Sequence, residues 1–133
     1  MANPSKQKGT TAERWECEFL NSRGFDTRRN PLHGAKDIGD LQSWIHGLNV
    51  CVEVKAGKRP LYSSWYEEAQ AEESNAGADV GMMVHKPEGV ARAHMGEWPV
   101  MLSQGDLMKL LAAAYAEGTG ERRTGPISTV DGY

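Results

Sequence analysis

The stretch that most constrains the fold is residues 50–55, which read VCVEVK. Successive side chains of a β-strand point to opposite faces of a sheet, so the three valines share one face. Cys51, Glu53 and Lys55 share the other face. Three β-branched residues on one face are typical of a strand that packs against a core. The stretch therefore predicts a central strand with a carboxylate and an ammonium on the face away from its valines.

The rest of the chain predicts three helices and, with the central strand, five strands. Helices are expected from Thr10 to a stop at Gly24, from Ser63 or Ser64 to about 76, and over 103–117; strands are expected over 25–30, 38–46, 48–55, 78–85 and 98–102. The first helix begins with TTAE, which has the form of a capping box, and a serine can cap the second. The order α-β-β-β-α-β-β-α predicts an α/β fold, with a mixed five-stranded sheet flanked by helices.

Length and composition predict one domain with polar ends. The 133 residues suit a single domain over 10–117, with a flexible basic arm over 1–9 and a disordered, Gly-rich tail over 118–133. No apolar run approaches the ~20 residues of a membrane span. The start, MANPSKQKG, lacks the apolar segment of a signal peptide. We therefore expect a cytosolic protein without membrane contact.

Charge is distributed unevenly along the chain. The net charge is −3, but residues 1–60 carry ten Lys and Arg against seven Asp and Glu. The remaining residues are strongly acidic. Because local charge decides polyanion binding more than the total does, a nucleic-acid partner for the first sixty residues is compatible with the composition.

The hairpin before Glu53 brings a third charged group to the same face. With a two-residue turn at 47–48, Asp40 would lie opposite Lys55 and diagonal to Glu53, because opposed residues of an antiparallel pair share a face. Asp37 would fall on the other face. This parity argument favours Asp40 over Asp37 as a site residue and predicts that Asp37→Asn stays active. A β-bulge would reverse it.

Two carboxylates and a lysine on one face allow two interpretations. One is a partly exposed salt-bridge cluster, which would contribute little to stability. The other is a site for a hard cation, since Mg²⁺ takes oxygen ligands and needs only one or two protein carboxylates besides substrate phosphate. The lysine would then orient a water or stabilise charge at phosphorus. The valine face favours the second interpretation, because it indicates a central strand.

The spacing and surroundings of these residues resemble a known nuclease superfamily. Asp40, a gap of 12 residues, and then Glu53-Val54-Lys55 resemble the PD-(D/E)xK signature. The run KGTTAERWECEFLNSRGF resembles the first helix of archaeal-type Holliday junction resolvases. GDL at 39–41 and CVEVK at 51–55 resemble their central hairpin. The resemblance spans roughly residues 8–86 and extends to small resolvase-like nucleases of bacteriophages and prophages.

The resemblance implies a restriction-endonuclease-like core and a metal-dependent DNA endonuclease that leaves a 5′-phosphate and a 3′-hydroxyl. Asp40 and Glu53, with the Val54 backbone carbonyl, would hold Mg²⁺ or Mn²⁺, and Lys55 would be the catalytic lysine. Glu13 would complete the metal shell directly or through water. Resolvases of this kind act as homodimers on branched DNA, with two sites that cut symmetrically.

The sequence departs from the family in two places, and Glu13 has an alternative role. Gly39 stands where the signature has proline, and the loop LHGAK before the aspartate lacks the family's serine. Glu13 is also the third helical position of the predicted capping box, which is a purely structural role.

Further residues are expected at the DNA surface. Basic residues flank the site, and an aromatic residue beside them can stack on a base or touch phosphate: Lys8, Arg28, Arg29, Lys36, Lys58, Arg59 and Tyr62. Lys6 would extend the basic arm. Gln70 is a candidate accessory residue, but the favoured interpretation is a solvated helical glutamine, since polar residues dominate exposed helix faces. The acidic face of Glu67, Glu68, Glu72 and Glu73 is expected to point away from DNA.

The sequence leaves the substrate and the dimer interface open. Besides a four-way junction resolvase acting in recombination and repair, it allows a nuclease for flaps, ends or duplex sites. A DNA-binding module without turnover and an α/β interaction protein also remain. The host would be a bacterium or a phage-infected cell. The dimer would form through the last strand and helix or through the loop at 86–97.

Overall fold

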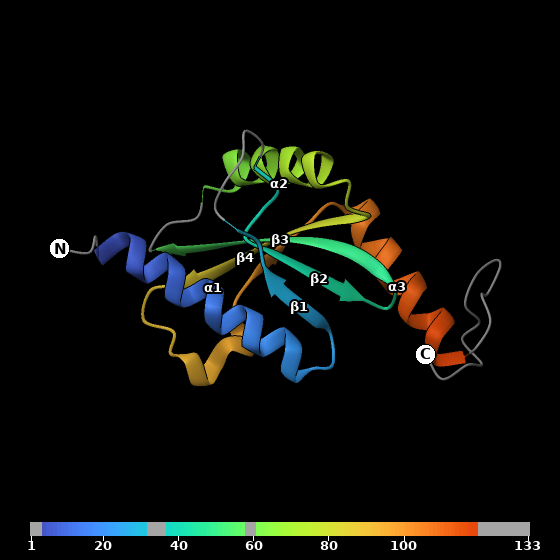
Figure 1. The fold of residues 1–133 in the computed structure, drawn as a ribbon, viewed down its shortest axis with the longest axis horizontal. Coiled ribbons are helices and arrows are strands. Elements are labelled where there is room, and N and C mark those ends of the chain that lie inside the picture. The colour runs from blue at the N-terminus through green and yellow to red at the C-terminus, as the bar shows by residue number, and fades with distance from the viewer. Residues whose placement is uncertain (1–3, 32–36, 58–60, 120–133) are drawn as a thin grey trace.

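A computed structural model describes residues 4–31, 37–57 and 61–119. In chain order the elements are α1 (Pro4–Ser22), β1 (Asp26–Arg29), β2 (Leu41–Ile45), β3 (Leu48–Gly57), α2 (Tyr62–Ala76), β4 (Val80–Pro87), the 3₁₀ helix η1 (Arg92–Glu97), β5 (Val100–Met101) and α3 (Gln104–Thr119) (Figure 1). The predicted α/β class and element order are confirmed. A 3₁₀ helix is added in the segment expected to be a loop.

The sheet has five strands in the order β1-β2-β3-β4-β5. The β3–β4 pair is parallel and the other pairs are antiparallel, so the sheet is mixed as predicted. α1 and α2 lie on opposite faces of it (Figure 1). β3 is the middle strand, and α2 is the connection that returns the chain to the parallel strand β4. None of the helices in the described ranges is long and apolar enough to cross a membrane.

β3 is buried on both faces by side chains from the two helices. Val50 and Val52 are fully buried and belong to a core cluster with Ala12 and Leu20 of α1. On the other face, Met83 of β4 packs with Trp65 and Ala69 of α2. Each fully buried valine contributes about 1.5–3 kcal/mol relative to an exposed one. The valine face therefore fixes α1 on one side and leaves the charged face of β3 under α2.

The predicted start of the first helix is wrong. α1 begins at Pro4, so residues 4–9, which were expected to form part of a flexible arm, are helical. Proline suits the first helical turn because its missing N–H would have no partner there. Thr10 and Glu13 consequently lie inside the helix, and the capping box predicted from TTAE does not form.

The other helix ends differ less from expectation. α2 begins at Tyr62, with Leu61 at the N-cap position and no side-chain cap. Ser64 Oγ instead donates to the Leu61 carbonyl at 3.1 Å, so the predicted serine cap is wrong. α3 continues to Thr119, and the rest of the predicted tail, 120–133, lies outside the described residues. Glu117 of α3 pairs with His46 in the turn between β2 and β3.

The turn of the central hairpin is at His46-Gly47, one residue earlier than predicted. Both residues have positive φ (49° and 81°), as type I′ hairpin turns require. Ile45 therefore pairs with Leu48, and Trp44 with Asn49. This moves the position opposite Asp40 from Lys55 to Glu53. The shift is two residues, so Asp40 keeps the face that parity assigned to it.

Glu16 provides a test of the packing of α1. Its side chain is 5% exposed in line with Ala12 and Leu20, and its Oε2 has no hydrogen-bond partner among the described residues. Burial raises the pKa of Glu16 to about 7. A raised pKa means that the folded state holds this proton more tightly than the unfolded state does. Its stabilising effect is complete below about pH 4.5 and is lost as pH rises towards 7.

We expect Glu16→Gln to be more stable than the parent protein at pH 8 by roughly 3 kcal/mol, and nearly equal to it at pH 4.5. The variant cannot ionise, so the difference between the two proteins isolates this carboxyl. Urea denaturation at both pH values measures it, with exposed Glu67→Gln as the control. A difference that does not change with pH would contradict the assignment.

Gly39 and Gly24 form a matched pair for testing the close approach of the loop before β2. Their φ values are +88° and +89°, so alanine suffers the same backbone strain at each. A Cβ on Gly39 would lie 2.6 Å from Cys51 Sγ, whereas a Cβ on Gly24 would meet nothing within 4 Å.

Gly24→Ala should therefore cost about 1 kcal/mol, from strain alone. Gly39→Ala should cost roughly 1–3 kcal/mol more, because it also overpacks the loop against β3. Chemical denaturation of both variants measures the two costs. Equal losses would show that the loop does not approach β3 this closely.

Candidate active site

The site lies where the pairing of β2 with β3 stops. β2 begins at Leu41, which pairs with Val52, while β3 continues to Gly57. Among the residues that the structure describes, the last part of β3 therefore has an open edge on the β2 side. Asp40 closes the start of that edge: its amide donates to the Val52 carbonyl at 3.0 Å, and its Oδ2 accepts from the Val54 amide at 2.8 Å. Asp40 is thus held in the plane of the sheet.

Glu53 and Lys55 project from the same part of β3, towards α2. Glu53 is 8% exposed, and its Oε1 is 3.8 Å from Lys55 Nζ. The ammonium lies closer to Glu68 of α2, with Nζ–Oε2 at 2.9 Å. Burial lowers the pKa of Lys55, but the hydrogen bond to Glu68 and the charge of Glu53 outweigh it and raise the pKa overall. Lys55 is therefore a protonated lysine fixed between two carboxylates.

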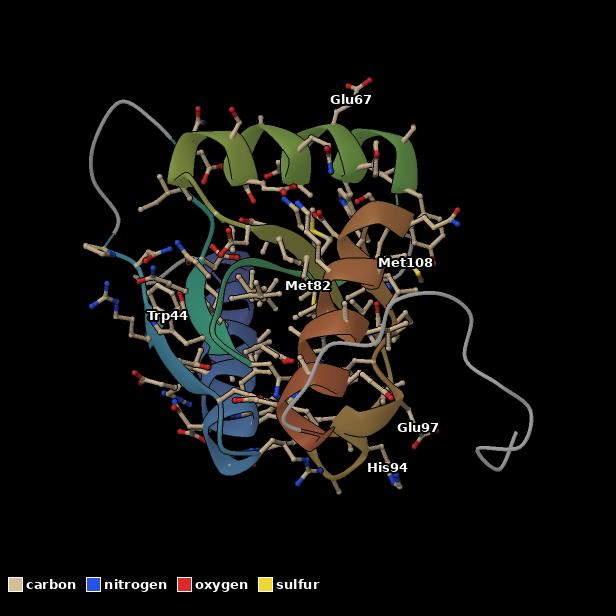
Figure 2. The ribbon with its side chains drawn as sticks, turned by 90° about the vertical axis from the view of Figure 1, so that its right-hand side faces the viewer. Trp44, Glu67, Met82, His94, Glu97 and Met108 are labelled. Atoms are coloured by element: carbon tan, nitrogen blue, oxygen red, sulfur yellow. The ribbon has the colours of Figure 1, made fainter. Side chains whose placement is uncertain are left out.

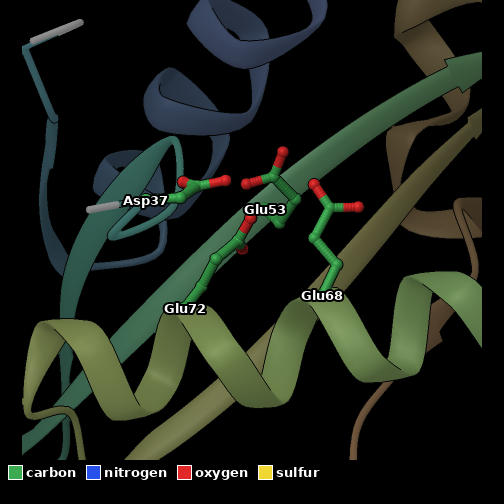
Figure 3. A group of neighbouring side chains, drawn as sticks. All are labelled: Asp37, Glu53, Glu68 and Glu72. Carbon is green, nitrogen blue, oxygen red and sulfur yellow. The ribbon is translucent and has the colours of Figure 1, made fainter. Parts of the chain in front are cut away.

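α2 adds two carboxylates that sequence reasoning assigned to the outside. Glu68 and Glu72, four residues apart on one helix face, point towards β3 (Figure 3), and Glu72 is 1% exposed. Only Glu67 of the predicted outward face is plainly directed into solvent (Figure 2). This face was expected to point away from DNA, but the structure places Glu68 and Glu72 beside Glu53 and Lys55. The available signal was the helical spacing of Trp65, Ala69 and Glu72, which places Glu72 in the apolar stripe.

Asp37 also reaches this side of β3. Oxygens of Asp37, Glu53, Glu68 and Glu72, hereafter the acidic cluster, lie within 4.8 Å of one another (Figure 3). The parity argument against Asp37 fails because this residue precedes β2, and side-chain alternation holds only within a strand. Its Oδ1 accepts from the Gly39 amide, and its carbonyl accepts from Asn75 Nδ2 at 2.9 Å. The loop is thereby tied to the end of α2.

Glu13 approaches Asp40 from the α1 side. Its carboxylate is 3.3 Å from Arg29 Nη2, and its side chain is 15% exposed. Burial and the neighbouring Asp40 carboxyl raise the pKa of Glu13 to about 7, against the opposing charge of Arg29. Burial likewise raises the pKa of Asp40 to about 6. The structural alternative for Glu13, the helix cap, is excluded because α1 begins at Pro4.

The carboxylates beside Glu53 lack compensating groups. Burial raises the pKa of Glu53, and the nearby Glu72 carboxyl and the charge of Lys55 only partly offset this. Burial and then the proximity of Glu53 and Asp37 raise the pKa of Glu72 far more. Within the described residues, Glu53 Oε2 and both oxygens of Glu72 have no hydrogen-bond partner. Buried oxygens of this kind fit a hard divalent cation, which takes carboxylate and carbonyl ligands.

The predicted DNA-contacting residues are placed only in part. Arg28 and Arg29 lie on the edge strand β1, and Arg28 Nε donates to Gln42 Oε1 at 2.9 Å. Both arginines line a pocket of about 570 Å³, together with the amides of Asn30, Gln42, Asn49 and Asn75. Lys36, Lys58 and Arg59 lie outside the described residues, and of Lys8 only the helical backbone is described. Their DNA contacts stay predictions.

Tyr62 and Gln70 lie away from the acidic cluster. Tyr62 is 51% exposed, packs edge-on against Trp65, and lines an apolar pocket of about 350 Å³ with His85 and Val100. Gln70 is half-buried on α2, two positions from both Glu68 and Glu72, which puts it on a different side of the helix. The structure does not bring Gln70 into the cluster.

Comparison with known proteins identifies the fold. No protein-family model matches the sequence, and no curated protein matches it. Among solved structures, the chain is similar to Hjc, a Holliday junction resolvase from Archaeoglobus fulgidus, with a TM-score of 0.53 and 21% sequence identity. The similarity covers 71% of this chain and 76% of the resolvase chain. The predicted resemblance to archaeal resolvases is thus confirmed for the fold: this chain folds as that resolvase does.

Proposed function

We propose that the protein is a metal-dependent DNA endonuclease. The observation that carries this proposal is that Asp40, Glu53 and Lys55 lie together at the open edge of β3, in a chain with a resolvase fold. An exposed salt-bridge cluster does not account for it, because Glu53 is buried and has an unpartnered oxygen. The alternative of a plain interaction protein leaves that buried charge unexplained.

The metal ligands in this proposal are Asp40, Glu53 and the Val54 carbonyl, with Glu13 acting directly or through water. The N–H and C=O of one strand residue project from the same edge, so the Val54 carbonyl shares the open edge with the amide that binds Asp40. Mg²⁺ or Mn²⁺ bound there would polarise a phosphate oxygen and lower the pKa of an attacking water.

Lys55 acts in this proposal as a charged donor and not as a base. Its carboxylate neighbours raise its pKa, so it carries its proton at neutral pH. An ammonium held beside Glu53 can stabilise the negative charge that develops at phosphorus and orient the attacking water. Products with a 5′-phosphate and a 3′-hydroxyl follow from attack that expels the 3′ oxygen.

The proposed substrate is branched DNA, with a four-way junction as the first choice. Arg28 and Arg29 on β1 border the side of the sheet where β3 is open, and they would contact the phosphate backbone. The resolvase fold favours a junction over flaps, ends or specific duplex sites. A role in recombination and repair in the cytosol of a bacterium or phage-infected host would follow from that substrate.

A homodimer would supply the two sites that a junction with two equivalent strands requires. Four large apolar side chains are 40–54% exposed on the last strand and helix: Val100, Leu107, Met108 and Leu111. The rival segment at 86–97, by contrast, directs Met95 into the core. These exposures support an interface formed by β5 and α3, on the side of the molecule that faces the viewer in Figure 2.

Cleavage assays test the catalytic proposal. Labelled four-way junction, flap, linear duplex and single strand are incubated with the protein and Mg²⁺ or a chelator. We expect paired, metal-dependent nicks in the junction. Asp40→Asn and Glu53→Gln should each lower the cutting rate at least ~100-fold, because each removes a ligand charge, while gel-shift affinity for the junction is retained.

Asp26→Asn, an exposed carboxylate on β1, is the matched control and should cut normally. Full activity of Asp40→Asn or Glu53→Gln would refute the proposed site. Salt-sensitive DNA binding with no cleavage of any substrate would instead establish the binding module.

Light scattering tests the interface. Met108→Glu and Leu111→Glu place charges on the exposed face of α3, and each should shift a dimer to monomer at micromolar concentration without changing the circular dichroism spectrum. Ala93→Glu, an exposed change on η1, should leave the dimer intact. The reverse pattern would place the interface in the 86–97 segment.

A further inference from the structure

The side chain of Glu72 has no role in the site as proposed so far. It is one of the largest fully buried side chains in the described chain, at 1% exposure, and neither carboxylate oxygen has a hydrogen-bond partner there. α2 directs it towards β3 together with Trp65 and Ala69. A buried carboxylate without partners costs several kcal/mol, so a folded protein keeps one only where something satisfies it.

The acidic cluster has more carboxyl groups than cations. Four carboxylates contribute oxygens within 4.8 Å of one another, and Lys55 is the one cation among the described residues at salt-bridge distance from them. Its ammonium lies against Glu68 and reaches Glu53 only at 3.8 Å. In Figure 3, the carboxylates of Asp37 and Glu72 converge on Glu53 from the loop and from α2.

The groups around the cluster are braced independently of any ion. Asn75 of α2 holds the Asp37 carbonyl, and Cys51 Sγ donates to the Ile38 carbonyl at 3.1 Å. A Cβ at Gly39 would lie 3.6 Å from Glu72 Oε2, so the loop backbone passes within van der Waals reach of this carboxylate. Three separate segments thus place oxygen ligands around one point.

This point differs from the one proposed for the catalytic metal. Asp40 and Glu13 approach Glu53 from the edge of β3 and from α1, whereas Asp37, Glu68 and Glu72 approach it from the loop and from α2. Glu53 stands between the two groups. A carboxylate in that position can bridge two ions, as in sites whose metals lie about 3.5–4 Å apart.

We propose that Asp37, Glu53, Glu68 and Glu72 form a second divalent-cation site, with Glu53 shared between the two ions. The ligands are all carboxylate oxygens, which suit Mg²⁺, Mn²⁺ or Ca²⁺. The ion would neutralise the negative charge of these carboxylates. It would also compete with Lys55 for Glu68, and this competition would direct the Lys55 ammonium towards the open edge of β3. This inference rests on the proposed function in one respect only, that Glu53 also faces a metal on the Asp40 side.

Counting bound ions tests the second site without measuring cleavage. The purified, metal-free protein is titrated with Mn²⁺ by isothermal calorimetry, and free Mn²⁺ is followed by electron paramagnetic resonance. We expect two ions per chain. Glu72→Gln, which keeps the shape of the side chain, should bind one, and Glu67→Gln, the exposed neighbour on the same helix, should bind two.

Asp37→Asn provides a second variant, because its side chain is exposed and its loss is not expected to impair folding. It should also lose one ion, or bind that ion at least ~10-fold more weakly, since one of four ligand charges is removed. If Glu72→Gln and Asp37→Asn bind Mn²⁺ as the parent does, protons alone satisfy the cluster and the proposal is overturned. A parent protein that binds a single ion would also overturn it.

Asp40→Asn separates this inference from the proposed function. With two sites, this variant should lose the ion on its own side and keep the ion that depends on Glu72. If Asp40→Asn still binds two ions and cuts DNA, the catalytic assignment fails while the second site stands. If Glu72→Gln binds as many Mn²⁺ ions as the parent while Asp40→Asn binds fewer and does not cut DNA, the second site fails while the catalytic assignment stands.

Discussion

The packing of the β3 valines against α1 is the constraint on which the rest of the structure depends. Val50, Val52 and Val54 are almost completely buried on that face, and strand alternation then leaves Glu53 and Lys55 no other face than the one under α2. A one-residue slip of register would turn both charges into the apolar core and the valines towards the carboxylates. Burial of the valines therefore sets the direction of Glu53 and Lys55, although the valines lie on the opposite face of the strand.

The end of β2 turns this charged face into a site. Because β2 stops at Leu41, backbone groups in the later part of β3 have no strand partner among the described residues. The Asp40 carboxylate binds the first of them, the Val54 amide. The same hydrogen bond aligns Asp40 between Glu13 on one side of the sheet and Glu53 on the other. Hydrogen bonds to a charged acceptor are stronger than neutral ones, so this contact also steadies the point where the sheet opens.

The accumulation of carboxylates has an energetic cost that the fold tolerates. Glu53 and Glu72 are buried with unpartnered oxygens, and burial raises the pKa of both. Lys55 offsets part of the charge through Glu68. A cluster that is unfavourable in the ion-free protein would become favourable when cations bind. Because the cations would bind the folded protein and not the unfolded chain, their binding would raise its stability.

The sequence by itself determined the element order, the central strand and the shared face of Asp40, Glu53 and Lys55, because these follow from periodicities within short segments. Only the tertiary structure decided which other groups join them. Asp37 lies in a loop, where alternation carries no information, and the inward turn of Glu68 and Glu72 depends on how α2 docks over β3. Local sequence patterns likewise did not predict the start of α1 at Pro4 or the turn at His46-Gly47, because the same residues were compatible with several helix caps and turn positions. Groups that are distant in the chain come together only when several segments pack against one another, and the sequence of any one segment does not contain that information.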